Sequence, residues 1–287
     1  MKRSILISGL VLTLVACVPN RSETLRLATT TSVYDSGLMD VLLPVFEKAN
    51  GVHVELLAVG TGQAFAMGRR GDVDVVLVHN QELERAFIEA GQGIERHPLM
   101  YNDFVLLGPL DDPADVRGEQ LAAEALRRIA AAQAPFASRG DDSGTHAREL
   151  DLWHLAGSNP DETNGWYLSL GQGMGETLQF AQERGVYTIS DRGTFLALQE
   201  NLPDLEIMVG GQVIEENGDP LLRNAYALIA VNPENHPGLN AGLTDRFITW
   251  MTGLQAQRII GAFGLERLGH PLFYPDSKAW RTANGSD

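Results

Sequence analysis

Cysteine is nearly absent from this sequence, because its 287 residues include only Cys17. One cysteine cannot form an intramolecular disulfide, and Cys17 lies in an apolar leader, which excludes it as the nucleophile of a folded enzyme. The enzyme motifs His-Glu-x-x-His, Gly-x-Ser-x-Gly and the P-loop are also missing. Ser143 and His146 have no evident third catalytic partner. We therefore expect no enzymatic activity and no cofactor, and an exported hydrolase is the least favoured alternative.

Positive charge is scarce as well. The chain carries 22 Lys and Arg against 37 Asp and Glu, a formal net charge of −15. So acidic a protein is not expected to bind nucleic acid. Because the overall field repels anions, any bound anion must be held by local donors.

Long apolar runs are confined to the start of the chain, and no later stretch approaches the roughly 20 residues of a transmembrane helix. Lys2 and Arg3 precede this apolar run, so we expect residues 1–16 to be a signal peptide. The sequence Leu-Val-Ala before Cys17 resembles the lipobox of bacterial lipoproteins. That resemblance implies an exported protein, in the periplasm or at the outer cell surface. It would touch the membrane only through lipid on Cys17, with residues 17–24 as a tether.

Strand-like and helix-like segments alternate along the rest of the chain. β-branched runs such as residues 74–79 are typical of buried parallel strands, and the apolar spacing of residues 81–90 indicates a helix. This alternation predicts an α/β fold with a mainly parallel sheet. The expected strands cover residues 25–28, 52–59, 74–79, 101–109, 187–190, 205–209 and 226–231, and the expected helices residues 37–50, 81–90, 117–132, 193–199 and 239–263.

Polar residues 111–113 mark the expected crossing between two domains. The first domain would comprise residues 24–100 and 235–287, and the second residues 101–234, with a ligand cleft between them. In open α/β sheets, ligands bind beyond the carboxyl ends of the strands.

Residues 136–145 combine features of a small-anion site. Arg139, two glycines and the hydroxyls of Ser143 and Thr145 lie between an apolar run and the start of a helical pattern. Helix-opening N–H groups carry partial positive charge, hydroxyls donate, and the guanidinium fork suits oxyanions. The alternative is an ordinary helix cap made by Asp141 or Ser143, with Arg139 in solvent.

Three further turns have similar chemistry. Residues 29–32 (Thr-Thr-Thr-Ser), 60–62 (Gly-Thr-Gly) and 171–175 (Gly-Gln-Gly-Met-Gly) each come before a helical pattern. Four such turns exceed what helix capping requires, and we expect them to converge on one ligand.

Together these motifs resemble the tungstate-binding proteins of bacterial ABC importers, from about residue 25 to beyond residue 226. The resemblance implies a type II periplasmic-binding-protein fold, in which two domains close on the ligand in an interdomain cleft. It implies a monomer that captures tungstate, with molybdate as a second candidate ligand. The protein would deliver the ion to an ABC permease driven by its ATPase. The metal would lie inside the oxyanion, with no direct side-chain coordination. The ligand-binding residues implied are Thr30, Thr31, Ser32, Thr61, Gly62, Arg139, Ser143, Gly144 and Thr145.

Several roles stay open at this level. A loop like 139–145 also occurs in phosphate-binding proteins, where the aspartate accepts the proton of hydrogen phosphate, so phosphate is the alternative ligand. Tungstate has no proton to offer, and we favour Asp141 as a helix cap. Arg139 would be the only full positive charge of the site. Arg192 is either a second anion donor or part of an interdomain ion pair, and His79 is interpreted as a core histidine.

Overall fold

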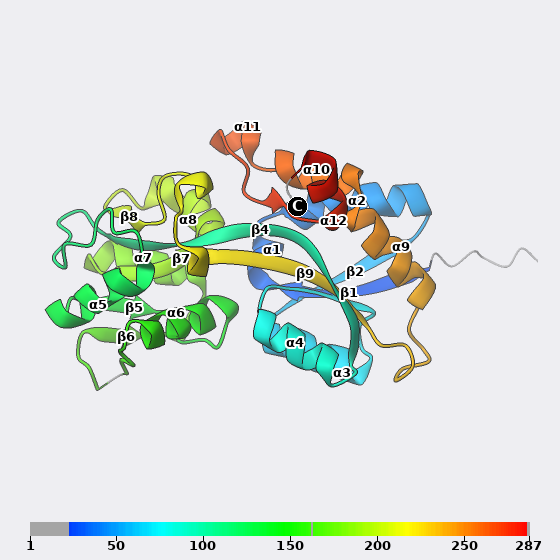
Figure 1. The fold of residues 1–287 in the computed structure, drawn as a ribbon, viewed down its shortest axis with the longest axis horizontal. Helices are drawn as coiled ribbons and strands as arrows, with labels where there is room; N and C mark the ends of the chain where they lie inside the picture. The colour runs from blue at the N-terminus through cyan, green and yellow to red at the C-terminus, as the bar shows by residue number, and fades with distance from the viewer. Residues whose placement is uncertain (1–22, 162, 286–287) are drawn as a thin grey trace, which may run out of the picture.

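The computed structural model describes residues 23–161 and 163–285. The expected signal peptide and Cys17 lie outside these residues. The chain forms two α/β lobes joined by two long strands (Figure 1). The strands run in the order β2-β1-β3-β9-β4-β7-β5-β6, and β8 and β10 pair with β4. No helix in the described part of the chain has the length and apolar character needed to cross a bilayer.

The first lobe is built around three parallel strands, β1 (Thr24–Thr30), β2 (His53–Val59) and β3 (Val75–Val78). Their side chains form one core with the C-terminal helices, because Leu42, Phe247 and Ile260 all lie in the same buried cluster as the strands. The remaining elements are α1 (Thr31–Asp35), α2 (Leu38–Asn50), α3 (Thr61–Arg70), α4 (Gln81–Glu89), α9 (Ala241–Thr252), α10 (Leu254–Ala262), α11 (Leu265–Leu268), β10 (Tyr274–Pro275) and α12 (Lys278–Asn284).

The second lobe has its own parallel strands, because β5 (Phe136–Ser138) pairs with both β6 (Tyr167–Ser169) and β7 (Tyr187–Asp191). Its other elements are α5 (Ala122–Ala132), α6 (Gly144–Leu155), α7 (Met174–Arg184), α8 (Arg192–Leu198), η1 (Gln199–Asn201), β8 (Leu205–Val209), η2 (Ile214–Glu216) and η3 (Pro220–Leu222).

Two strands connect the lobes. β4 (Gly93–Pro109) pairs with β9 (Arg223–Val231) on the first-lobe side and with β7 and β8 on the second-lobe side, always antiparallel. The prediction of a mainly parallel sheet is therefore wrong at the connection, although each lobe has a parallel set. The expected strand over 101–109 is the second half of β4. The first half was not predicted because it contains Pro98, which has no N–H to donate and argues against a strand in the sequence. In the structure Pro98 lies next to a register shift between β4 and β9.

Two helix predictions also change. The segment expected to be helical over 117–132 becomes helical only at Ala122, because Gly118 adopts a left-handed φ of +79°. Residues 239–263 form two helices that meet at Gly253, which takes an extended conformation.

Candidate functional site

The first lobe presents hydroxyl groups where β1 ends and α1 begins. Thr30 is buried, and its Oγ1 lies 3.2 Å from Ser32 Oγ. Thr31 and Ser32 line a cavity of about 610 Å³ between the lobes. Thr29, in the same motif, donates its hydroxyl to the Leu77 carbonyl and so belongs to the sheet.

Thr61 contributes a further hydroxyl from this lobe, at the start of α3. Thr61 is the first residue of α3, and α3 begins next to α1 because Val59 pairs with Thr30 across β2 and β1. Thr61 Oγ1 has no hydrogen-bond partner among the described residues. Gly62 follows it, and a Cβ placed there would meet no atom within 4 Å.

The loop between β5 and α6 has a strained backbone. Gly140 has φ +61° and Asp142 has φ +56°. A side chain at Gly140 would collide with Ser169 Oγ, so glycine is required there. The two left-handed residues turn Asp141 back toward the start of the loop.

Asp141 pairs with Arg139. Its Oδ2 lies 2.6 Å from Arg139 Nη2, and its Oδ1 accepts a hydrogen bond from the Ser143 N–H at 3.2 Å. The helix cap of α6 is Ser143, whose hydroxyl accepts from the His146 N–H. The favoured interpretation of Asp141 as the cap is therefore wrong, because Ser143 holds that position. Asp141 does face its own backbone with one carboxylate oxygen, while the other pairs with the guanidinium.

Arg139 is buried, with 7% of its surface exposed, which excludes the alternative of a solvated side chain. Its Nε has no hydrogen-bond partner in the described structure. Arg139 lines the same cavity as Thr31 and Ser32. Arg267 also lines it, so Arg139 is not the only cation at this cavity.

The start of α6 contacts the first lobe. Thr145 is buried, and a Cβ at Gly144 would lie 2.7 Å from His79 Cε1. His79 Nδ1 lies 2.8 Å from Asn224 Oδ1, and its ring lies 4.6 Å from that of Tyr226. Burial lowers the pKa of His79 to about 4, so the ring is neutral at pH 7. His79 is the satisfied core histidine that the sequence predicted.

The expected site residues therefore fall into groups. Thr31, Ser32 and Arg139 line the 610 Å³ cavity, as do Gly173 and Met174 of the fourth turn. Thr30, Thr61 and Thr145 are buried, and Ser143 caps its helix. Gly144 lines a different cavity, shared with His79.

Asp191 is a cavity residue that sequence reasoning missed. It caps α8 by accepting hydrogen bonds from the N–H and hydroxyl of Thr194, and it lines the 610 Å³ cavity. Burial raises its pKa. The Asp-x-x-Thr spacing at the end of a strand was the signal that could have found it.

Glu149 of α6 is a second buried residue that sequence reasoning missed. It is buried and accepts hydrogen bonds from the Tyr167 hydroxyl at 2.8 Å and from Trp153 Nε1 at 3.2 Å. Burial raises the pKa of its carboxyl to about 7, although hydrogen bonds to the carboxylate oppose this. No sequence pattern marks such a residue, because its burial depends on tertiary packing.

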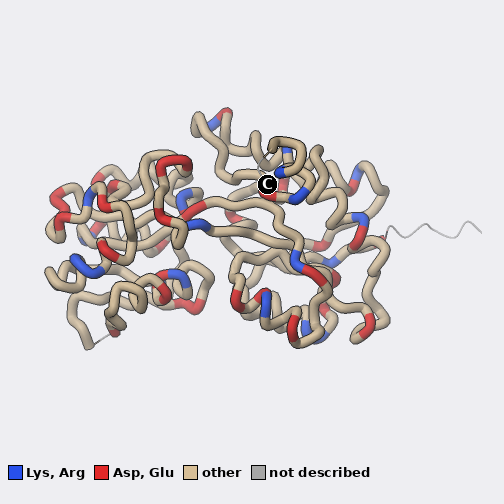
Figure 2. The backbone as a smooth tube through the Cα atoms, in the orientation of Figure 1, with Lys and Arg blue, Asp and Glu red and all other residues tan. Residues whose placement is uncertain are grey.

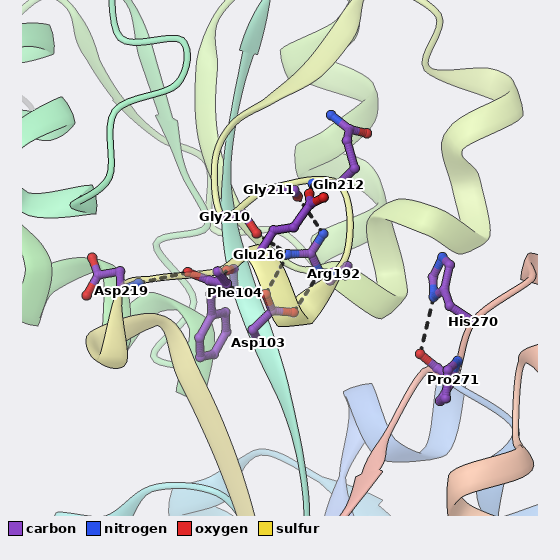
Figure 3. A network of polar contacts seen from close by, with 11 residues as sticks. Asp103, Phe104, Arg192, Gly210, Gly211, Gln212, Glu216, Asp219, His270 and Pro271 are labelled. Atoms are coloured by element: carbon purple, nitrogen blue, oxygen red, sulfur yellow. Dashed lines mark hydrogen bonds and ion pairs between the residues drawn. The ribbon is translucent and has the colours of Figure 1, made fainter.

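Arg192 is not free to bind an anion. Its Nε and Nη2 donate to the two carboxylate oxygens of Asp103 at 2.8 and 2.6 Å, and the carbonyls of Gly210 and Gly211 accept further bonds (Figure 3). The ion pair is therefore present, with its partner on the connecting strand β4. Both residues lie within the segment 101–234 assigned to the second domain, so the expectation that the pair joins two domains is wrong.

Comparison with known proteins agrees with this architecture. Residues 18–253 match the model of the PBP superfamily domain. A putative ABC transporter anion-binding protein of Haloferax volcanii is 45% identical over 256 residues, which cover 89% of this chain and 73% of the relative. The tungstate-binding protein TupA of Peptoclostridium acidaminophilum is 45% identical over 253 residues, 88% of this chain and 85% of the relative.

A solved structure gives the same result. The tungstate-binding protein TupA from Desulfovibrio alaskensis G20 is 44% identical, with a TM-score of 0.79, and the alignment covers 90% of this chain and 100% of that one. The chain therefore belongs to the PBP superfamily and, within it, to the family of the tungstate-binding proteins.

Proposed function

We propose that this protein is an extracytoplasmic solute-binding protein that captures tungstate, and also molybdate, between its lobes and delivers it to an ABC importer. The observation that carries the proposal is a pair of buried donors, one from each lobe. Thr61 Oγ1 and Arg139 Nε are without hydrogen-bond partners among the described residues. A buried unpaired donor costs free energy unless an acceptor meets it.

A tetrahedral dianion suits such donors, because it has only acceptor oxygens. A hydrogen bond to a charged group contributes about 1.5–3 kcal/mol, and a helix N-terminus about 0.3–2 kcal/mol. The starts of α3 and α6 supply both side-chain hydroxyl donors and the N–H groups of a helix N-terminus. The proposed ligand set is Thr30, Thr31, Ser32, Thr61, Gly62, Arg139, Ser143, Gly144 and Thr145, with lobes made of residues 24–100 with 235–287 and of residues 101–234.

Phosphate is the second candidate, and one observation favours it. The carboxylate of Asp141 lines the cavity next to Arg139, where it could accept a hydrogen bond from the protonated oxygen of hydrogen phosphate. The same carboxylate would repel an unprotonated dianion. The 45% identity to a tungstate-binding protein over most of the chain leads us to place tungstate first.

The test is titration calorimetry of the mature, ligand-free protein with tungstate, molybdate, phosphate and sulfate. Tungstate should bind most tightly or equally with molybdate, and it should raise the melting temperature by binding only the native state. A larger shift with phosphate than with tungstate would replace tungstate by the second candidate.

The membrane attachment and partners are also proposals. Cys17 would carry the lipid, residues 17–24 would form the tether, and the monomer would meet a permease with its ATPase. Cys17→Ser should abolish incorporation of labelled fatty acid and release the protein from the membrane fraction. Unchanged labelling in that variant would refute the anchor without touching the ligand proposal.

A further inference from the structure

We propose that a second cavity, between α4 of the first lobe and α6 of the second, binds a small anion that carries two or more carboxylate or phosphate groups. The two helices lie on the same side of the connecting strands (Figure 1). The cavity has a volume of about 570 Å³ and shares no lining residue with the 610 Å³ cavity. Five arginines line it: Arg85, Arg96, Arg148, Arg223 and Arg281.

Five guanidinium groups at one cavity are unexpected in this protein. Acidic residues outnumber basic ones by 37 to 22, and they are spread over both lobes (Figure 2). Three carboxylates line the same cavity, those of Glu82, Asp151 and Asp276. A fourth carboxylate, Glu84, pairs with Arg96 from outside the lining, so the five arginines exceed these carboxylates by one. The overall field, by contrast, repels anions from most of the surface.

The arginines are only partly neutralised by these carboxylates. Arg223 and Arg281 share a single oxygen, Asp276 Oδ1, at 3.2 Å each. Arg148 lies 3.9 Å from Asp151, at the limit of an ion pair. Because Arg223 and Arg281 share one carboxylate oxygen and Arg148 has only a distant partner, these three guanidinium groups keep N–H donors for an anionic ligand.

Arg96 provides a specific donor of this kind. Its Nε binds the buried carboxylate of Glu84 at 2.6 Å. Among the residues described, its buried Nη2 has no hydrogen-bond partner, and neither has the other oxygen of the same carboxylate, Glu84 Oε1. A bound carboxylate or phosphate oxygen would satisfy this donor and remove the cost of leaving it unpaired.

The electrostatics of His79, which also lines this cavity, agree with a cationic environment. Burial is the main cause of its lowered pKa, and the charges of Arg148 and Arg139 lower it further. The ring is therefore neutral and would not add a sixth positive charge at pH 7.

The size and spacing of the cavity favour a ligand larger than one oxyanion. Its volume falls in the range of about 300–1,000 Å³ that is usual for small-molecule sites. The arginines come from α4, β4, α6, β9 and α12 and surround the space from several directions. The planar fork of arginine matches the geometry of both carboxylate and phosphate groups, so a di- or tricarboxylate or a compound with two phosphates fits this arrangement.

Titration calorimetry with citrate and with pyrophosphate tests the proposal. At least one probe should bind the ligand-free protein with a Kd of about 1 mM or tighter, and Arg148→Ala should weaken that binding about tenfold or more. Arg246→Ala is the matched control, because Arg246 pairs with Glu23 at the exposed surface, and it should bind the probe as the parent does.

Arg139→Ala separates the two sites. It should retain probe binding while it loses tungstate binding, whereas Arg148→Ala should show the opposite pattern. If neither probe binds, or if Arg139→Ala abolishes probe binding and Arg148→Ala does not, the second site does not exist. Failure of the tungstate proposal would instead appear as absent tungstate binding in the parent protein.

Discussion

The two lobes contribute unlike groups to the proposed ligand site. The first lobe offers the neutral hydroxyls of Thr30, Thr31, Ser32 and Thr61 at the starts of two helices. The second lobe offers a full charge, Arg139, held by a carboxylate on a left-handed turn. The proposed site therefore combines neutral donors at regular helix starts with a charged group on an irregular loop.

This difference separates two tasks. Hydroxyls and helix N–H groups at strand ends are positioned by the sheet and bring at most a partial charge. In the proposed site the buried guanidinium of Arg139 supplies a full positive charge, which the structure pairs with Asp141. We expect changes in the second lobe to alter charge-dependent binding strongly and changes in the first to have smaller effects.

Arg192→Ala should give the largest effect, a loss of about 3–5 kcal/mol in the free energy of unfolding, because it leaves the buried Asp103 carboxylate without its cation. Chemical denaturation measures this loss. The folded fraction should bind tungstate as before, since the ion pair already occupies this guanidinium. A stable variant with impaired tungstate binding would make Arg192 a ligand donor.

Arg139→Ala should reduce tungstate affinity by about a hundredfold or more, or about 3 kcal/mol, because it removes charge-assisted hydrogen bonds from a buried site. Arg139→Lys should restore part of the loss, since the charge returns without the planar fork. Titration calorimetry of both variants measures the effect. Affinity within about tenfold of the parent for Arg139→Ala would place the site elsewhere.

Glu149 should make stability depend on pH. Its pKa rises from 4.5 in the unfolded chain to about 7 in the fold, so its contribution is present below pH 4.5 and lost as the pH rises through 7. The full change is up to about 3 kcal/mol. Glu149→Gln should remove this dependence in denaturation series at several pH values. An unchanged profile would mean that another group titrates.

Thr61→Val should weaken tungstate binding about tenfold, because it removes one hydroxyl donor without changing the shape of the side chain. Stability without ligand should stay the same or rise, since the buried hydroxyl has no partner in residues 23–161 and 163–285. Thr29→Val is the control: it removes a hydroxyl that donates to the Leu77 carbonyl, and it should lower stability but not affinity. If Thr61→Val left tungstate affinity unchanged while Thr29→Val weakened it, Thr61 would not be a ligand donor.

Asp141→Asn should have the smallest effect, a roughly threefold gain in tungstate affinity, because the ion pair is partly exposed and its field is weakened by solvent. Phosphate binding should not improve. Parallel titrations with the two anions measure both changes. Weaker tungstate binding in this variant would show that Asp141 positions Arg139 more than it repels the ligand.

Much of this arrangement could be predicted from local patterns. The four turns at helix starts, the strands of the first lobe and the core position of His79 follow from periodicity and turn chemistry. The direction of β4 and β9 could not be predicted, because apolar alternation does not distinguish parallel from antiparallel pairing. The Arg139–Asp141 ion pair depends on the φ angle of Asp142, and the burial of Glu149 and Asp191 depends on packing between elements distant in the chain.

The path of the chain through the connecting strands has a consequence for folding. β3 ends at Val78, but its neighbour β9 begins only at Arg223, after the whole second lobe. Contacts between segments so far apart form slowly, because the chain must close a long loop first. We expect the first lobe to be the last to complete its sheet, and the emerging chain to expose the edge of β3 until β9 arrives.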